Sequence, residues 1–171
     1  MRRAMPSNHS PCKMKHLLAM TPALLLATHT LACPALRRDD VVVLVNAARE
    51  HGAACTASSA GGAGALRWSD RLEQAALAQA QWLASRNTLL HTGPQGQTLS
   101  ERARAVGYRF VRVTENLGYG QTLLPQLLKG WTDSPTHCAN LHDPRVTEMA
   151  LACVPSAAGR PLWVMLQGRP S

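Results

Sequence analysis

The sequence predicts a single α+β domain in which helices come first and an antiparallel sheet follows. Three observations support this fold class. Helix-capping residues with helical apolar spacing fill the first part of the chain, two short apolar runs lie near the C-terminus, and a turn-rich segment separates those runs. A chain of 171 residues is long enough for one domain with a sizeable core.

The N-terminal 1–32 segment is predicted to be a secretion signal. A basic run precedes the apolar stretch 17–31, which is too short and too interrupted by proline and histidine to cross a membrane. A small-x-small cleavage pattern then precedes Cys33, and Met14 is an alternative start. Residues 33–171 are predicted to form the single domain.

Cysteine parity bears on the compartment. After cleavage, the cysteines are Cys33, Cys55, Cys138 and Cys153, which suits two disulfides in an oxidising environment. A lipid on Cys33 would leave three cysteines, one of which could not form a disulfide. We therefore expect a secreted or periplasmic protein, with a lipoprotein anchored through Cys33 as the alternative.

Five helix starts are marked by a capping residue or by a proline in the first turn. They lie at Asp39–Asp40, Ser69–Asp70, Thr98, Pro125 and Ser134–Pro135. The second helix continues as an alanine-rich apolar stripe, which indicates close packing against another layer. Residues 56–65, T-A-S-S-A-G-G-A-G-A, are predicted to form a surface loop.

The strands are expected near the C-terminus. The apolar runs Val146–Val154 and Leu162–Gln167 flank P-S-A-A-G-R-P, which is typical of a hairpin loop. The segment E-N-L-G-Y-G, residues 115–120, is interpreted as a turn. It lacks the G-x-G-x-x-G spacing of a nucleotide-binding loop.

The charge distribution argues against nucleic-acid binding. The formal net charge is +8, but four of the basic residues lie in the predicted signal, leaving 14 basic against 10 acidic residues. Those 14 are dispersed along the chain, whereas a nucleic-acid surface needs a clustered basic face.

A series of short motifs carries a family resemblance. In order they are L-V-N-A-A-R (44–49), L-R-W (66–68), L-L-H-T-G (89–93), E-N-L-G-Y-G (115–120) and W-T-D-S-P-T-H-C-A-N-L (131–141). The series resembles the CAP superfamily, also called the SCP domain family, over about residues 41 to 168. That family includes cysteine-rich secretory proteins, antigen-five venom proteins, plant pathogenesis-related proteins and secreted bacterial proteins, and the bacterial branch looks most similar.

The resemblance implies a three-layer α-β-α sandwich with a central antiparallel sheet, and a cleft lined by two histidines and acidic residues. His91 and His137 match the two family histidines, and Glu115 matches the acid of the E-N motif. The second family acid falls at Ser134 here, while Asp133 beside it is expected to point elsewhere. Three of the four family positions are therefore kept.

Two interpretations of this cleft remain open. Two neutral imidazoles suit zinc or another divalent cation, with Glu115 or water completing the shell. Alternatively, His91 and His137 belong to a hydrogen-bonded network that fixes the cleft. Glu115 is a candidate general base, or a carboxylate that accepts hydrogen bonds from backbone amides in a glycine-rich turn. The Ser134 hydroxyl is expected to cap the following helix rather than to act as a nucleophile.

The favoured function is a monomeric, non-enzymatic secreted module that requires no cofactor and binds an extracellular or envelope ligand. The family resemblance suggests a lipid, sterol, peptide or protein as that ligand. The alternative is a metal-assisted, peptidase-like hydrolase that uses His91, His137 and Glu115.

Several residues are expected to have structural roles. Asn46 and Arg49, three residues apart on one helix face, would brace the cleft. Asn116 and Trp131, in the family motifs, are assigned to the scaffold. We expect the disulfides Cys33–Cys55 and Cys138–Cys153, although the sequence does not prove the pairing.

Overall fold

The computed structural model describes Met1, residues 33–50, Cys55 and residues 63–171. The predicted signal segment and most of the predicted loop at 56–65 lie outside these residues. Within the described part of the chain, no helix is long and apolar enough to cross a membrane.

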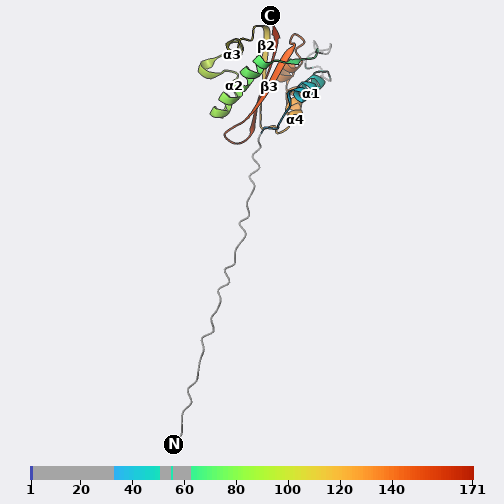
Figure 1. The fold of residues 1–171 in the computed structure, drawn as a ribbon. Coiled ribbons are helices and arrows are strands. Elements are labelled where there is room, and N and C mark those ends of the chain that lie inside the picture. The colour runs from blue at the N-terminus through green and yellow to red at the C-terminus, as the bar shows by residue number, and fades with distance from the viewer. Residues whose placement is uncertain (2–32, 51–54, 56–62) are drawn as a thin grey trace.

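Five α-helices, one single-turn 3-10 helix (η1) and four strands make up the described domain (Figure 1). In chain order they are α1 (Arg38–Glu50), β1 (Arg67–Trp68), α2 (Asp70–Arg86), η1 (Pro94–Gly96), α3 (Leu99–Ala105), β2 (Phe110–Tyr119), α4 (Leu124–Thr132), α5 (Pro135–Leu141), β3 (Glu148–Pro155) and β4 (Pro161–Pro170).

The strands form one sheet in the order β1-β3-β4-β2. β3 and β4 form the predicted antiparallel hairpin, and β2 adds antiparallel to the other side of β4. The predicted antiparallel sheet is correct for these three strands. β1 instead pairs parallel to β3 over two residues, so the sheet is mixed. This short strand leads directly into α2, which packs on one face of the sheet.

The E-N-L-G-Y segment is a strand rather than the predicted turn. Its residues pair continuously with β4, from Glu115 opposite Leu166 to Tyr119 opposite Leu162. The glycine in this segment serves close packing. A Cβ at Gly118 would overlap Leu127 of α4 and lie 3.4 Å from Trp163 Cβ.

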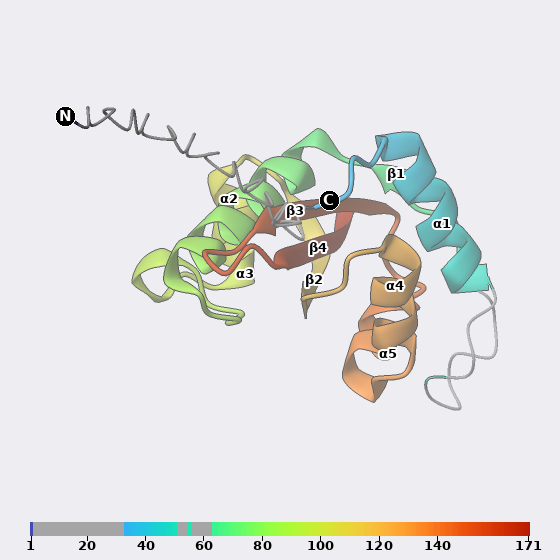
Figure 2. The same ribbon diagram turned by 90° about the horizontal axis from the view of Figure 1, so that it is seen from below.

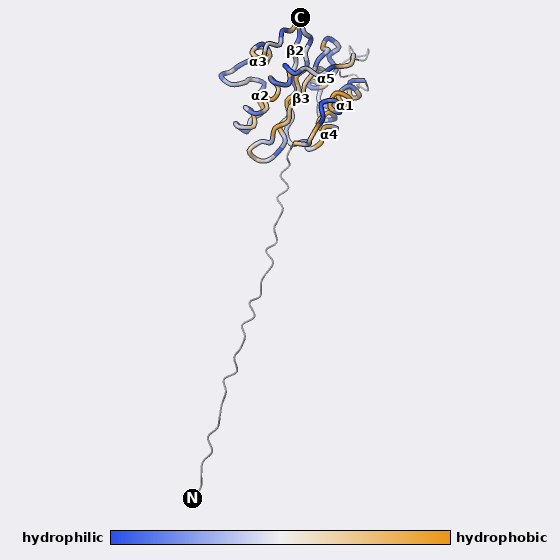
Figure 3. The backbone as a smooth tube through the Cα atoms, in the orientation of Figure 1, coloured by the Kyte–Doolittle hydropathy of each residue, from blue (hydrophilic) through white to orange (hydrophobic). Residues whose placement is uncertain are grey.

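Two apolar cores cover the two faces of the sheet and create three layers, which confirms the α-β-α sandwich. Figure 2 shows α2 and α3 on one side of the strands and α1, α4 and α5 on the other. Alternate residues of β3 enter different cores: Met149 and Leu151 pack with α1, α4 and α5, whereas Ala150 and Ala152 pack with α2 and α3. Figure 3 shows the apolar character of β3 and of the helices beside it.

The helix starts follow the predicted chemistry with three differences. Asp39 and Asp40 lie within the first turn of α1 rather than before it. Thr98 and Glu101 form the expected capping box at α3. Ser69 precedes α2 but makes no side-chain cap hydrogen bond, and Glu73 instead accepts a hydrogen bond from Trp68 Nε1 at 3.2 Å. At α5, the Ser134 hydroxyl likewise makes no cap and contacts His137.

Candidate functional site

The candidate site is built around β2, which lies at one edge of the sheet. Glu115 is opposite Leu166, whose side chain belongs to the α2–α3 core, so Glu115 points to that face. Its carboxylate is buried, with a side-chain exposure of 2%. A charged group at this depth needs charged or hydrogen-bonding partners.

Two side chains from separate elements supply these partners. His91, in the loop after α2, places Nδ1 2.8 Å from Glu115 Oε1. Arg102 of α3 donates from Nη2 to Glu115 Oε2 at 2.8 Å and also to the backbone oxygen of His91 at 3.0 Å. Both carboxylate oxygens are therefore engaged, and the loop that carries His91 is held to α3.

His137 reaches the same strand from the opposite face. It lies in the first turn of α5, and its Nδ1 is 3.0 Å from Ser134 Oγ. Asn116, the neighbour of Glu115 on β2, donates to the backbone oxygen of His137 at 2.9 Å. Asn140 of α5 donates to Asn116 Oδ1 and to the backbone oxygen of Glu115. These bonds fix α5 against the edge strand.

The two histidines have opposite electrostatic environments. The hydrogen bond to Glu115 raises the pKa of His91, although partial burial opposes this. Burial lowers the pKa of His137, and the charge of His91 lowers it further. His91 therefore holds a proton more readily than His137 near neutral pH.

Arg102 is the main site residue that the sequence analysis missed. It is buried with 6% exposure, although arginine is rarely buried without a charged partner. A signal was present, because Arg102 lies on the same helical stripe as the apolar Leu99 and Val106. An arginine within an apolar stripe indicates a buried acidic partner.

The residues assigned to the scaffold bind backbone groups of neighbouring segments. Asn46 exchanges two hydrogen bonds with the backbone of Leu66, and Trp131 donates to the backbone oxygen of Leu117 at 2.8 Å. Arg49 is buried and donates to backbone oxygens, including that of Gly64 at 2.8 Å. Burial lowers the pKa of Arg49 to about 10, although the nearby Asp143 opposes this shift.

Asp133 does not take the place of the missing second acid. It is largely exposed and pairs with Lys129 at 2.7 Å, four residues earlier. The position that corresponds to the second acid is held by Ser134, whose hydroxyl contacts His137. The site thus combines two histidines and one buried carboxylate with a buried arginine and a serine.

The disulfide pairing differs from our prediction. The structure contains Cys33–Cys153 and Cys55–Cys138, in place of Cys33–Cys55 and Cys138–Cys153. The Cα atoms of the two observed pairs lie 5.7 and 5.6 Å apart, within the usual range for disulfides. Pairing by proximity in the sequence fails here because the fold places Cys33 beside Cys153 of β3, and Cys55 beside Cys138 of α5.

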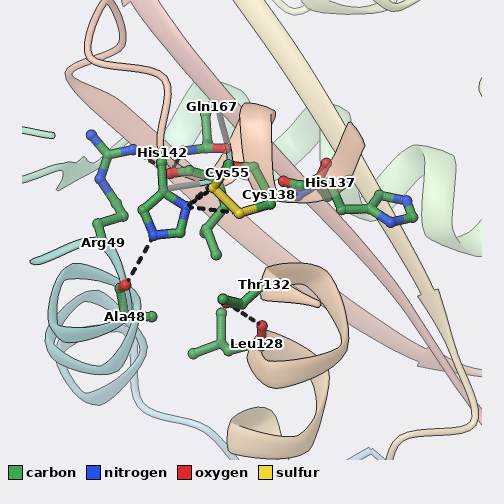
Figure 4. Close-up of a disulfide and its surroundings, with 11 residues drawn as sticks. Ala48, Arg49, Cys55, Leu128, Thr132, His137, Cys138, His142 and Gln167 are labelled. Atoms are coloured by element: carbon green, nitrogen blue, oxygen red, sulfur yellow. Dashed lines mark hydrogen bonds between the residues drawn. A yellow bond between two sulfur atoms is a disulfide. The ribbon is translucent and has the colours of Figure 1, made fainter. Parts of the chain in front are cut away.

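The predicted metal ligands do not form a compact three-ligand cluster. Among the described residues, one group of three His, Cys, Asp or Glu side chains has its ligand atoms within 4.8 Å of one another: Cys55, Cys138 and His142. Its two sulfurs are joined in a disulfide. Figure 4 shows His137 directed away from that disulfide.

Comparison with known proteins places these features in a family context. The family model described as "CAP: Cysteine-rich secretory protein family" matches residues 42–167. No curated protein matches the chain.

Similar solved structures come from bacteria. An outer surface protein from Borrelia burgdorferi has a TM-score of 0.64 and 21% identity, with 80% of this chain and 97% of that chain covered. An extracellular protein containing an SCP domain, from Bacillus anthracis, has a TM-score of 0.62 and 18% identity. A cysteine-rich secretory protein from Staphylococcus aureus has a TM-score of 0.52 and 13% identity. The latter two matches cover 80% of this chain but only 45% and 41% of those chains.

Proposed function

Because the chain belongs to the cysteine-rich secretory protein (CAP) family, we propose that it is an extracellular binding module rather than a hydrolase. In this proposal, His91 and His137 hold a divalent cation at the edge of β2. The observation that carries the proposal is the engagement of both Glu115 oxygens, one by His91 and one by Arg102.

An extracellular location is supported by the cysteines. Two disulfides suit an oxidising compartment, and the similar structures include an outer surface protein and an extracellular protein. The bond from Cys33 to Cys153 occupies the sulfur that a lipid anchor would need. This favours release from the membrane over anchoring through Cys33.

The environment of Glu115 disfavours hydrolysis. A general base must reach the water or hydroxyl whose proton it removes. The Glu115 carboxylate is buried, and its oxygens accept hydrogen bonds from Arg102 and His91. To act as a base, it would have to break an ion pair with a buried arginine, which favours a positioning role.

The same contacts suit the histidines for cation binding. Nδ1 of His91 faces a carboxylate and Nδ1 of His137 faces a hydroxyl, so Nε2 is the free ligand atom of each ring among the described contacts. A carboxylate on the second ring nitrogen is a common support for a metal-binding histidine, because it fixes the tautomer and strengthens the ligand. The lowered pKa of His137 keeps that ring neutral, as a ligand must be, whereas a cation bound at His91 must displace the proton that its raised pKa favours. Zinc or a similar divalent cation would take these two nitrogens, with water completing the shell.

Calorimetric titration of zinc into the metal-stripped protein tests the proposal. We expect one site that is lost in His91→Ala and in His137→Ala. Glu115→Gln should weaken binding by roughly 10–100-fold, because it removes the support of His91. Asp133→Asn is the matched control, since it removes an acid beside the site that faces away from it. Folded wild-type protein that shows no binding would refute the cation site.

A peptide-hydrolysis assay separates binding from catalysis. The wild-type protein should show no zinc-dependent cleavage of an unstructured peptide above the level of His91→Ala. Cleavage that is abolished both by a chelator and by Glu115→Gln would establish the hydrolase instead.

A further inference from the structure

A group of one histidine and two cysteines lies apart from the proposed cation site. His142, which follows α5, places Nδ1 3.2 Å from Cys55 Sγ and 3.7 Å from Cys138 Sγ (Figure 4). His142 and Cys138 are buried, and Cys55 is half-buried. Neither the CAP motifs nor the proposed function uses His142.

Each ring nitrogen of His142 lies near a backbone oxygen, so its contacts fit either neutral tautomer. Its Nε2 lies 3.1 Å from the backbone oxygen of Ala48, and its Nδ1 lies 3.1 Å from that of Cys138. A neutral imidazole carries one N–H and can donate to only one of these oxygens. In the tautomer that donates from Nε2 to Ala48, the Nδ1 lone pair faces the two sulfurs. A backbone oxygen on the far nitrogen is the usual support of a metal-binding histidine.

We propose that reduction of the Cys55–Cys138 disulfide creates a zinc site with two cysteine thiolates and His142 Nδ1 as ligands. Tetrahedral zinc with ordinary bond lengths requires sulfur–nitrogen separations of about 3.6 Å and a sulfur–sulfur separation of about 3.8 Å. The two observed sulfur–nitrogen separations, 3.2 and 3.7 Å, lie on either side of the first value. Once the disulfide bond is broken, the two sulfurs need only to move apart to about 3.8 Å. Water would be the fourth ligand.

A dithiol reductant can supply the two electrons and two protons that reduce the Cys55–Cys138 disulfide. A thiolate of the reductant attacks Sγ of Cys55, the more exposed of the two residues, and the sulfur–sulfur bond breaks with Cys138 as the leaving thiolate. The second thiol of the reductant then displaces Cys55, so that the reductant becomes a disulfide and the protein gains two electrons and two protons. Zinc binding releases those two protons, because both ligands must be thiolates.

The proposed site would keep one connection in either redox state. The disulfide joins Cys55 to Cys138 of α5, and zinc held by the same two residues would preserve that link when the chain is reduced. The Cys33–Cys153 pair differs, because within the described residues it has no third metal-binding side chain at this range. Reduction in the presence of zinc should therefore break the Cys33–Cys153 connection and replace the Cys55–Cys138 disulfide by a zinc-bridged link.

Cobalt and zinc titrations of the reduced protein test this proposal. The protein carries Cys12→Ser, which removes the fifth cysteine of the chain. It is reduced with a phosphine, and the reductant is then removed in the absence of oxygen. The reduced protein is titrated with Co²⁺ and afterwards with excess Zn²⁺. We expect a thiolate-to-cobalt charge-transfer absorption at one ion per chain that zinc abolishes. The oxidised protein should show no such absorption. His142→Ala should weaken zinc binding by at least about tenfold, and Cys55→Ser should remove the charge-transfer signal.

Two controls identify the ligands. The double variant Cys33→Ser/Cys153→Ser should retain the absorption, because its cysteines are outside the proposed site. The double variant His91→Ala/His137→Ala should also retain it, so failure of the cation site proposed above would not affect this result.

Two outcomes would overturn the proposal: a folded, reduced wild-type protein without the absorption, or an undiminished signal in His142→Ala. If reduction unfolds the chain, zinc should restore its near-ultraviolet circular dichroism in the wild type but not in His142→Ala. A failure of zinc to restore it would also overturn the proposal.

Discussion

The substitution Arg102→Met tests how much the ion pair between Glu115 and Arg102 contributes to the free energy of unfolding. Methionine keeps most of the length and apolar volume of the side chain but removes the charge and the hydrogen-bond donors. In the variant, the Glu115 carboxylate retains only the contact with His91, whose side chain is 64% exposed. The carboxylate itself is 2% exposed, so water cannot readily replace the guanidinium.

The expected loss is large for a single substitution. Removing one partner of a buried ion pair typically costs about 3–5 kcal/mol, because the other charge stays buried without compensation. For a domain of this size, that loss corresponds to a decrease in Tm of roughly 10 °C or more. Lys129→Met is the matched control. It breaks an exposed pair with Asp133, and we expect a change within about 1 kcal/mol.

Urea denaturation followed by tryptophan fluorescence measures both losses with the disulfides intact. Arg102→Met/Glu115→Gln should be more stable than Arg102→Met, since the double variant leaves no unpaired carboxylate. A loss below about 1 kcal/mol in Arg102→Met would refute the reasoning. Glu115 would then be hydrated without its arginine, and its role as a base would have to be reconsidered.

The remaining predictions concern the two histidines, Ser134 and two glycines. In NMR titrations of the metal-free protein, His91 should titrate above and His137 below the usual histidine pKa of about 6.5. The contribution of His91 to the free energy of unfolding should therefore fade as pH rises through its raised pKa. Ser134→Ala should weaken zinc binding severalfold in calorimetry while leaving Tm nearly unchanged, because it removes only the contact to Nδ1 of His137. Gly118→Ala should lower stability by about 1–3 kcal/mol in urea denaturation, because its methyl group meets an α4 leucine. Gly130→Ala, within α4 and with open space around its Cβ position, should instead raise stability by up to about 1 kcal/mol.

The helices and the C-terminal hairpin could be predicted because their signals are local. The capping box at Thr98 and the proline in the first turn of α4 act on residues within one turn. The same reasoning misread β2, since glycine and asparagine usually indicate turns. Gly118 is a glycine because Leu127 and Trp163 pack against its backbone, and that requirement comes from α4 and β4.

The site could be predicted in part, and for the same reason. The family resemblance located His91, Glu115 and His137, but the partner of Glu115 comes from α3, and its identity depends on how that helix packs against β2. The disulfide pairing is also a property of the packed layers. Four cysteines allow three pairings, and local spacing does not choose among them.

The pairing of Cys33 with Cys153 has a mechanical consequence. The bond closes a loop between residues 120 positions apart, and the Cys55–Cys138 bond lies nested inside it. A pulling force applied between Cys33 and the C-terminus would pass directly through the sulfur atoms to β3. It could extend only residues 154–171, which have a contour length of about 60 Å, because the chain between the two cysteines lies outside the covalent path of the force. Traction would instead act on β4, which lies between β3 and β2, and would pull it away from the strand that carries Glu115.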